Sequence, residues 1–132
     1  MIRFALITPL LLAACAMAPG TGTGSGGERP APVYEGVETS LLEGDLVQFR
    51  VFMRGPEAPG DLDDYAQCAA AQYALIRGYG FARHVRTTTK QSGGSRSADA
   101  VYLISPSLPR GLRTIDAEVV VADCEANGIP TV

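Results

Sequence analysis

The sequence contains little histidine and cysteine, and it lacks any long apolar run. One histidine and three cysteines occur in 132 residues, and these cysteines do not have the paired short spacing typical of zinc sites. No stretch of 18 apolar residues occurs, which argues against an ordinary membrane-spanning helix. The formal net charge of −3 does not suit a strongly basic nucleic-acid binder. We therefore expect no metal, no dissociable cofactor and no nucleic-acid partner.

Familiar catalytic motifs are missing as well. The patterns G-x-S-x-G and H-E-x-x-H and the Walker phosphate-binding loop do not appear. Ser92, Ser95 and Ser97 lie in a Gly-rich stretch without a local base, so a small hydrolase that uses one of them is only an alternative hypothesis. The acidic run at 61–64 lacks the later Gly and Glu of a calcium loop and suits the start of a helix. The sequence predicts a protein that is not an enzyme.

The first fifteen residues have the layout of a secretory signal, with a basic start, a short apolar core and small residues before a cleavage point. Arg3 supplies the positive charge, and the string Leu12-Ala13-Ala14-Cys15 resembles a bacterial lipobox. The resemblance implies that residues 1–14 are a signal peptide and that Cys15 carries a covalent lipid with palmitate-like acyl chains. Several acyl chains anchor a protein stably where one does not. The alternative is a plain cleaved signal in which Cys15 is incidental.

The residue after Cys15 is Ala16 and not Asp. In lipoproteins of bacteria with two membranes, the absence of Asp at this position implies sorting to the outer membrane, here to its periplasmic face. Residues 15–39 are rich in Gly, Pro, Ser and Thr, and they predict a flexible linker that spans about 25–30 Å. The folded periplasmic domain is expected at 40–132.

The pattern of the remaining residues predicts one helix among several strands. Alternating apolar residues at 45–54 indicate a strand. Further strands are expected at 40–43, 81–90, 100–105 and 114–122. A strand–helix–strand crossover places the first two main strands parallel, and the rest can be antiparallel. The predicted fold is a two-layer α+β domain, in which one amphipathic helix packs on a mostly antiparallel sheet of about four strands.

The predicted helix runs from Asp61 to Arg77, and Gly78 is suited to end it in a left-handed conformation. Its apolar residues recur at helical spacing and form one face. The members of this face are Leu62, Tyr65, Ala66, Ala69, Tyr73 and Ile76. The alanine-rich middle allows the helix to lie close to a sheet.

If Cys15 is lipidated, Cys68 and Cys124 remain as an even pair. An oxidising periplasm favours a disulfide between them, which would join the helix to the last expected strand. Two buried thiols are one alternative. A thiolate nucleophile or a metal site with His84 are two others, although nothing in the sequence places His84 beside either cysteine.

Basic residues recur on one side of two predicted strands. Arg50 and Arg54 alternate with apolar residues in the first strand, and His84, Arg86 and Lys90 are expected to share a face in the second. If these strands are neighbours, the uncovered sheet face carries a cationic stripe. This stripe could contact anionic lipid or an acidic envelope protein. The alternative is a solvated face whose charges discourage edge pairing.

The segment from Leu46 to Arg86 resembles small uncharacterised lipoproteins of alphaproteobacteria. The resemblance rests on a strand ending at Arg54-Gly55, on the Ala-rich helix YAQCAAAQYALI and on its closure by Gly78-Tyr79. It implies the α+β fold and the lipoprotein assignment, and it transfers no catalytic residue.

Together these patterns predict a membrane-anchored lipoprotein whose domain is a non-catalytic envelope accessory or binding module. A periplasmic domain that binds a small ligand between sheet and loops is the alternative hypothesis.

Overall fold

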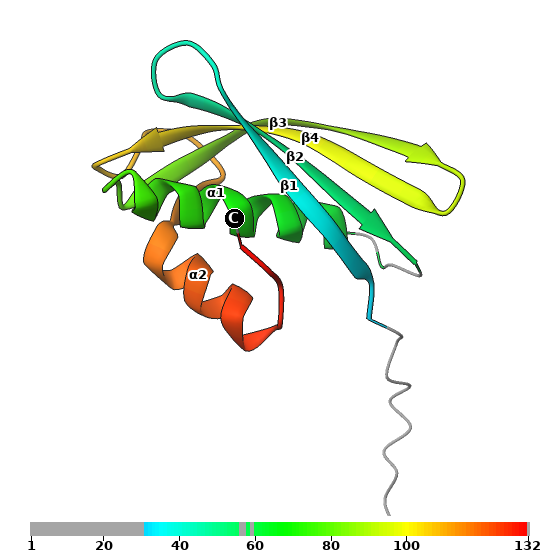
Figure 1. Cartoon of the computed structure of the whole chain (residues 1–132). Helices are drawn as coiled ribbons and strands as arrows, with labels where there is room; N and C mark the ends of the chain where they lie inside the picture. The colour runs from blue at the N-terminus through cyan, green and yellow to red at the C-terminus, as the bar shows by residue number, and fades with distance from the viewer. Residues whose placement is uncertain (1–30, 56–57, 59, 132) are drawn as a thin grey trace, which may run out of the picture.

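The computed structural model describes residues 31–55, 58 and 60–131, and seven elements follow one another in this part of the chain. In chain order they are β1 (Val33–Leu41), β2 (Leu46–Arg54), α1 (Asp61–Ile76), β3 (Phe81–Ser92), β4 (Ser95–Ser105), β5 (Thr114–Asp116) and α2 (Ala117–Ala126). The strands form one sheet in the order β1-β2-β4-β3-β5, and every neighbouring pair is antiparallel. Helix α1 lies across one face of the sheet, and α2 packs against α1 (Figure 1).

The predicted α+β class is therefore right, although the open sheet described here has five strands and the helices number two. Strands β2 and β3 run parallel, as the crossover through α1 predicts, because each is antiparallel to β4. Strand β4 lies between them, so they are not neighbours. No helix in the described part is long and apolar enough to cross a bilayer.

Alternation in β2 determines which face of the sheet is covered. Its apolar residues at 47, 49, 51 and 53 are at most 1% exposed, and they face α1 together with alternate residues of β4. The alanines of α1 at positions 66, 69, 70, 71 and 74 are fully buried. Because alanine is small, the helix can pack close to the sheet over its whole middle. The core is thus a layer between β2, β4 and α1.

Strand β1 begins before the expected start of the folded domain. The expectation that the linker runs to residue 39 is wrong, because Val33 pairs with Arg54 and the ladder continues to the partners Leu41 and Val47. A register shift between Tyr34 and Gly36 interrupts the alternation of this strand. That interruption removes the period-two signal by which a strand is recognised in a sequence.

The expected strand at 114–122 is wrong beyond Asp116, because the chain turns there into α2. The side chain of Asp116 caps this helix, and its Oδ1 accepts hydrogen bonds from the N–H groups of Glu118 and Val119 at 3.1 and 3.4 Å. An aspartate cap stabilises a helix by about 1 kcal/mol. This exceeds the helix propensity lost at any one β-branched valine, a few tenths of a kcal/mol.

Helix α1 ends as predicted, with Gly78 at a φ of 77°. Most of the predicted apolar face is buried, but Tyr73 is half-buried and Ile76 is 62% exposed. The prediction for Ile76 is wrong because the residue lies in the last turn of the helix, beyond the buried stretch that ends at Ala74.

A disulfide joins Cys68 to Cys124, which confirms the predicted pairing. The bridge connects α1 to α2 and not to a strand, since Cys124 lies in α2. Both cysteines are at most 3% exposed. The second helix is thereby fixed to the outer side of α1.

Reduction of this disulfide should lower the free energy of unfolding by about 4 kcal/mol, because it opens a loop whose ends lie 56 positions apart. Urea unfolding followed by circular dichroism, with and without reductant, measures the loss. The double variant Cys68→Ala/Cys124→Ala is the matched control, and reductant should not change its midpoint. Equal midpoints for the oxidised and reduced wild-type protein would contradict this prediction.

Candidate functional site

The five basic residues predicted to share a sheet face do not form one stripe. Arg50 and Arg54 lie on β2, while Arg86 and Lys90 lie on β3, and β4 separates the two strands. These four residues occupy the face opposite α1, since residues that pair across the ladder share a face. The fifth, His84, lies on the other face.

Carboxylates interleave with the basic residues on this uncovered face. Among the described residues the ion pairs are Arg50–Glu38 at 3.9 Å, Arg54–Glu35 at 3.5 Å and Arg86–Asp99 at 3.7 Å. Pairs this exposed contribute little to stability. They do make the face mixed in charge, so its attraction for an anionic surface is smaller than a count of its arginines suggests. Binding of an anionic surface by the four basic residues stays a prediction.

A register shift in β3 explains the position of His84. Between His84 and Arg86 the ladder to β4 shifts by one residue, so that Val85 is the extra residue of a bulge. His84 pairs with Tyr102, which pairs in turn with the buried Val47. The prediction that His84 and Arg86 share a face is wrong, because strict alternation fails at the bulge.

Both ring nitrogens of His84 are engaged. A guanidinium nitrogen of Arg113 lies 3.2 Å from Nδ1, and Oγ1 of Thr87 lies 2.6 Å from Nε2. Because a guanidinium only donates, Nδ1 must accept, and the proton of the neutral ring is assigned to Nε2. Nε2–H then donates to Thr87, whose own hydroxyl hydrogen is left to point elsewhere. In this arrangement the histidine has no free lone pair with which to act as a base on a substrate.

His84 and its partners line a groove of about 510 Å³ between the flank of α1 and β3. The groove forms because β3 carries a polar helix-side face and α1 lies mainly over β2 and β4. Its lining residues come from four segments of the chain. They are Asp63, Gln67, His84, Thr87, Thr89, Tyr102, Arg113 and Ile115. We call this set the His84 groove.

Tyr102 is the buried member of the His84 groove. Its residue is 4% exposed, and its hydroxyl has no hydrogen-bond partner among residues 31–55, 58 and 60–131. Burial is the main cause that raises its pKa; Asp63 raises it further and Arg113 opposes this rise. The hydroxyl thus lies within the field of both charges. The hydroxyl is not among the fully buried atoms that lack a partner, which in the described part of the chain are Nε of Arg83 and Oδ1 of Asp99, so its oxygen is open to the groove.

Arg113 has an unusual backbone conformation. Its φ of 58° is the one positive value for a residue other than glycine in the described part of the chain. Its carbonyl accepts a hydrogen bond from the N–H of His84 at 3.1 Å. The backbone contact and the side-chain contact together hold Arg113 against β3, where its guanidinium faces the groove.

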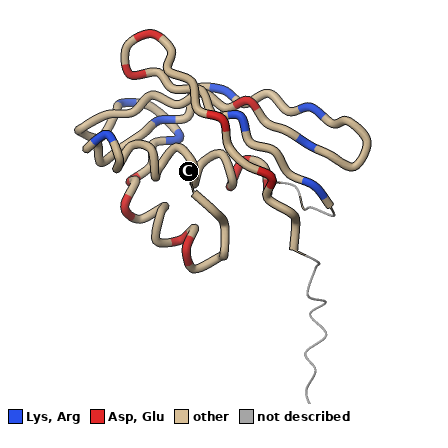
Figure 2. Tube along the Cα trace, viewed as in Figure 1, with Lys and Arg blue, Asp and Glu red and all other residues tan. Residues whose placement is uncertain are grey.

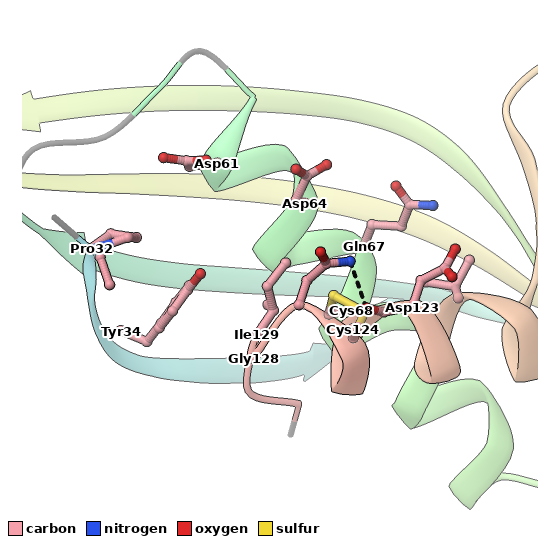
Figure 3. A pocket seen from close by; sticks show the side chains of 13 residues that line it. Pro32, Tyr34, Asp61, Asp64, Gln67, Cys68, Asp123, Cys124, Gly128 and Ile129 are labelled. Carbon is pink, nitrogen blue, oxygen red and sulfur yellow. Dashed lines mark hydrogen bonds between the residues drawn. A yellow bond between two sulfur atoms is a disulfide. The ribbon is translucent and has the colours of Figure 1, made fainter. Parts of the chain in front are cut away.

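A second cavity of about 620 Å³ lies beside the disulfide (Figure 3). Asp61, Asp64 and Asp123 contribute carboxylates, and none of its described lining residues is basic. Burial, followed by the charges of Asp61 and Asp63, raises the pKa of Asp64. The described residues contain no group of three or more His, Cys, Asp or Glu side chains suited to a metal ion. The described lining of this cavity therefore carries only negative charge, and its carboxylates are not arranged to hold a metal ion.

The charges of the protein are divided between its layers (Figure 2). Within their bounds α1 and α2 carry acidic residues and no lysine or arginine, whereas the strands β2 to β4 carry most of the basic ones. The His84 groove lies where the two layers meet, with Asp63 from α1 on one side and Arg113 on the other. It is the best candidate for a binding site because both charges and the hydroxyl of Tyr102 line it.

We expect the pKa of His84 to lie below its usual 6.5, because burial and the charge of Arg113 lower it more than Asp63 and the backbone of Arg86 raise it. The single imidazole signal in an NMR titration measures this pKa directly. Arg113→Gln should raise it and Asp63→Asn should lower it. Since protonation is disfavoured in the folded state, His84 contributes stability above about pH 6.5 that is lost as the pH falls. A folded-state pKa at or above the value in urea would contradict the assignment.

Most residues of the His84 groove carry no recognisable signal in the sequence. Asp63 belongs to the acidic run at 61–64, which is read as a helix start, and Thr87, Tyr102 and Arg113 have no motif. The predicted serines lie elsewhere: Ser92 and Ser95 pair next to the two-residue turn of the β3–β4 hairpin, and Ser97 pairs with Lys90. The one signal in the sequence is the single histidine, His84, in a polar strand. It does not identify the rest of the groove, because most of the other lining residues lie far from it in the sequence.

Comparison with known proteins gives a family without an assigned activity. The family described as YNQ4 C-terminal domain matches residues 34–128. A protein described as "Uncharacterized 26.9 kDa protein in nqo8 5'region", from Paracoccus denitrificans, is 32% identical over 85 residues. The match covers 64% of this chain and 33% of that protein, so the chain spans about a third of its relative. No solved structure matches the chain.

Proposed function

The chain belongs to the YNQ4 C-terminal domain family, and we propose that it is a lipid-anchored protein of the bacterial envelope whose domain is a non-catalytic accessory or binding module. The predicted anchor is Cys15, which lies outside the described residues. The predicted location is the periplasmic face of the outer membrane. The relative from Paracoccus denitrificans supports the alphaproteobacterial resemblance and carries no information on lipidation.

The observation that carries the proposal is the use of the cysteines. Cys68 and Cys124 are joined in a disulfide, and such bonds persist in oxidising compartments such as the periplasm. Cys15 is then the third and remaining cysteine, and it stands in the lipobox-like string at the end of an export signal. An odd cysteine count is thereby explained without a reactive thiol.

The geometry of His84 supports a non-catalytic role. Its Nδ1 faces Arg113 and its Nε2 faces Thr87, so it does not have the free lone pair that a general base needs. Ser97 lies about 20 Å along the sheet from His84, since it pairs with a residue six positions further on β3. Cys68 and Cys124 are joined to each other and have no free thiolate. A hydrolase or a thiol enzyme would have to recruit other groups.

The intact mass of the unreduced protein, extracted from a secretion-competent bacterium, tests the anchor and the bridge together. We expect a mass that lacks residues 1–14, includes acyl chains and is lower by two hydrogens for the disulfide. The variant Cys15→Ser should lose the acyl mass and retain the disulfide. An unacylated wild-type protein would refute the anchor.

The residue that follows Cys15 should determine whether the protein is sorted to the inner or to the outer membrane. We expect the wild-type protein in the outer-membrane fraction of a density gradient, because Ala16 does not provide the retention signal that Asp gives in lipoproteins. Ala16→Asp should move the protein to the inner-membrane fraction, and Ala16→Ser should leave it unmoved. Wild-type protein in the inner-membrane fraction would refute this location.

One observation favours the alternative of a small-ligand-binding domain. The His84 groove is within the usual volume range of ligand sites, about 300–1,000 Å³, and the hydroxyl of Tyr102 opens onto it. A binding module and a tethered accessory protein are compatible, because the groove and the predicted anchor lie in different parts of the chain.

A further inference from the structure

We propose that the His84 groove binds a small zwitterion, such as an amino acid or a dipeptide, with its carboxylate at Arg113 and Thr87 and its ammonium at Asp63. The inference rests on the binding part of the proposed function and does not depend on the lipid anchor. It is carried by the distribution of donors and acceptors around the groove.

Donor groups occupy the side of the groove formed by β3 and the loop before β5. Arg113 donates toward Nδ1 of His84 at 3.2 Å, and its remaining guanidinium N–H groups are available to a ligand. Thr87 accepts from Nε2 of His84 at 2.6 Å, so its hydroxyl hydrogen is free to donate. A carboxylate accepts hydrogen bonds from both kinds of group, and a charged donor makes such bonds stronger.

The opposite side of the groove provides an acceptor. Asp63 projects from the first turn of α1, and within the described part of the chain its carboxylate forms no ion pair or hydrogen bond with another residue. Arg113 likewise forms no ion pair there. Two opposite charges that line one groove without pairing with each other suit a ligand that carries both charges.

Tyr102 supplies the observation that is independent of these charges. The residue is 4% exposed and lines the groove, and its hydroxyl, which is not among the fully buried unpaired atoms of the described residues, is open to a ligand there. The charges of Asp63 and of Arg113 both act on this hydroxyl. A bound ligand would satisfy it, since a hydroxyl can both donate and accept.

Small molecules that carry both charges, one charge or none can separate the contributions of the ligand's carboxylate and ammonium to binding. The full chain, purified in detergent, is titrated with L-alanyl-L-alanine, with propionate, with ethylamine and with glucose. The single His84 signal in the NMR spectrum reports binding at this groove. We expect the dipeptide to bind about tenfold or more tightly than either singly charged probe, because each lacks one charged contact.

Variants then assign each end of the ligand. Asp63→Asn should weaken binding of the dipeptide about tenfold and leave binding of propionate unchanged. Arg113→Asn should weaken both, and asparagine tolerates the left-handed backbone at this position. The matched controls are Arg110→Asn and Asp123→Asn, which change charges outside the groove and should have no effect.

Tyr102→Phe tests the groove by a second route. Because the hydroxyl has no protein partner, the variant should unfold at the same urea concentration as the wild type while binding the dipeptide several-fold more weakly.

Several outcomes would overturn the proposal. These are no saturable shift of the His84 signal with the dipeptide at millimolar concentration, equal binding of propionate, or tighter binding of glucose. Full affinity in Asp63→Asn would also overturn it. Each of these leaves the acyl mass of the protein untouched, so failure here is distinguishable from failure of the anchor.

Discussion

The packing of α1 between the sheet and α2 is the constraint on which the rest of the structure depends. The alanines at 66, 69, 70, 71 and 74 are fully buried. Because their side chains are small, the helix approaches β2 and β4 closely. Its outer side is covered by α2, which the disulfide holds in place. Because one short helix cannot cover a five-stranded sheet, the helix-side face of β3 stays open beside α1. The His84 groove is the consequence of this incomplete cover.

The chemistry of the groove follows from the bulge in β3. Without the extra residue at Val85, the side chain at 84 would share the uncovered face with Arg86, as strict alternation predicts. The shift places the histidine beside Arg113 and Thr87, and the cationic neighbour fixes its uncharged tautomer. A histidine held in this way orients other donors and is poorly suited to take a proton. This is why the arrangement favours recognition over catalysis.

The sequence predicts the elements whose signals are local. The strand at 45–54, the alanine-rich helix and its stop at Gly78 are recognisable because each rests on a periodic pattern or a single backbone requirement. The disulfide is predictable from the cysteine count combined with an export signal. Strand β1 and helix α2 are not, because a bulge removes the alternation of the first and a run of valines conceals the second. In α2 the cap by Asp116 and the tertiary contact of Cys124 outweigh the weak preference of those valines.

The groove could not be predicted for a related reason. Its members come from α1, β3, β4, the loop before β5 and β5 itself, and each has an ordinary local explanation. Asp63 suits a helix start, and Thr87 suits a strand. The register of the sheet places Tyr102 beside His84, and the packing of α1 and of the loop before β5 adds the two charges. The functional signal therefore lies in the tertiary arrangement and not in a motif.

The family match includes the proposed ligand site and does not include the proposed lipid anchor. The matched residues, 34–128, run from β1 to the end of α2 and include every residue of the groove. The predicted signal, the lipid site at Cys15 and most of the linker lie before this range. A ligand site is therefore a property that other members of the family can share, because it needs only the folded unit. The anchor has to be established for each chain from its own N-terminal sequence.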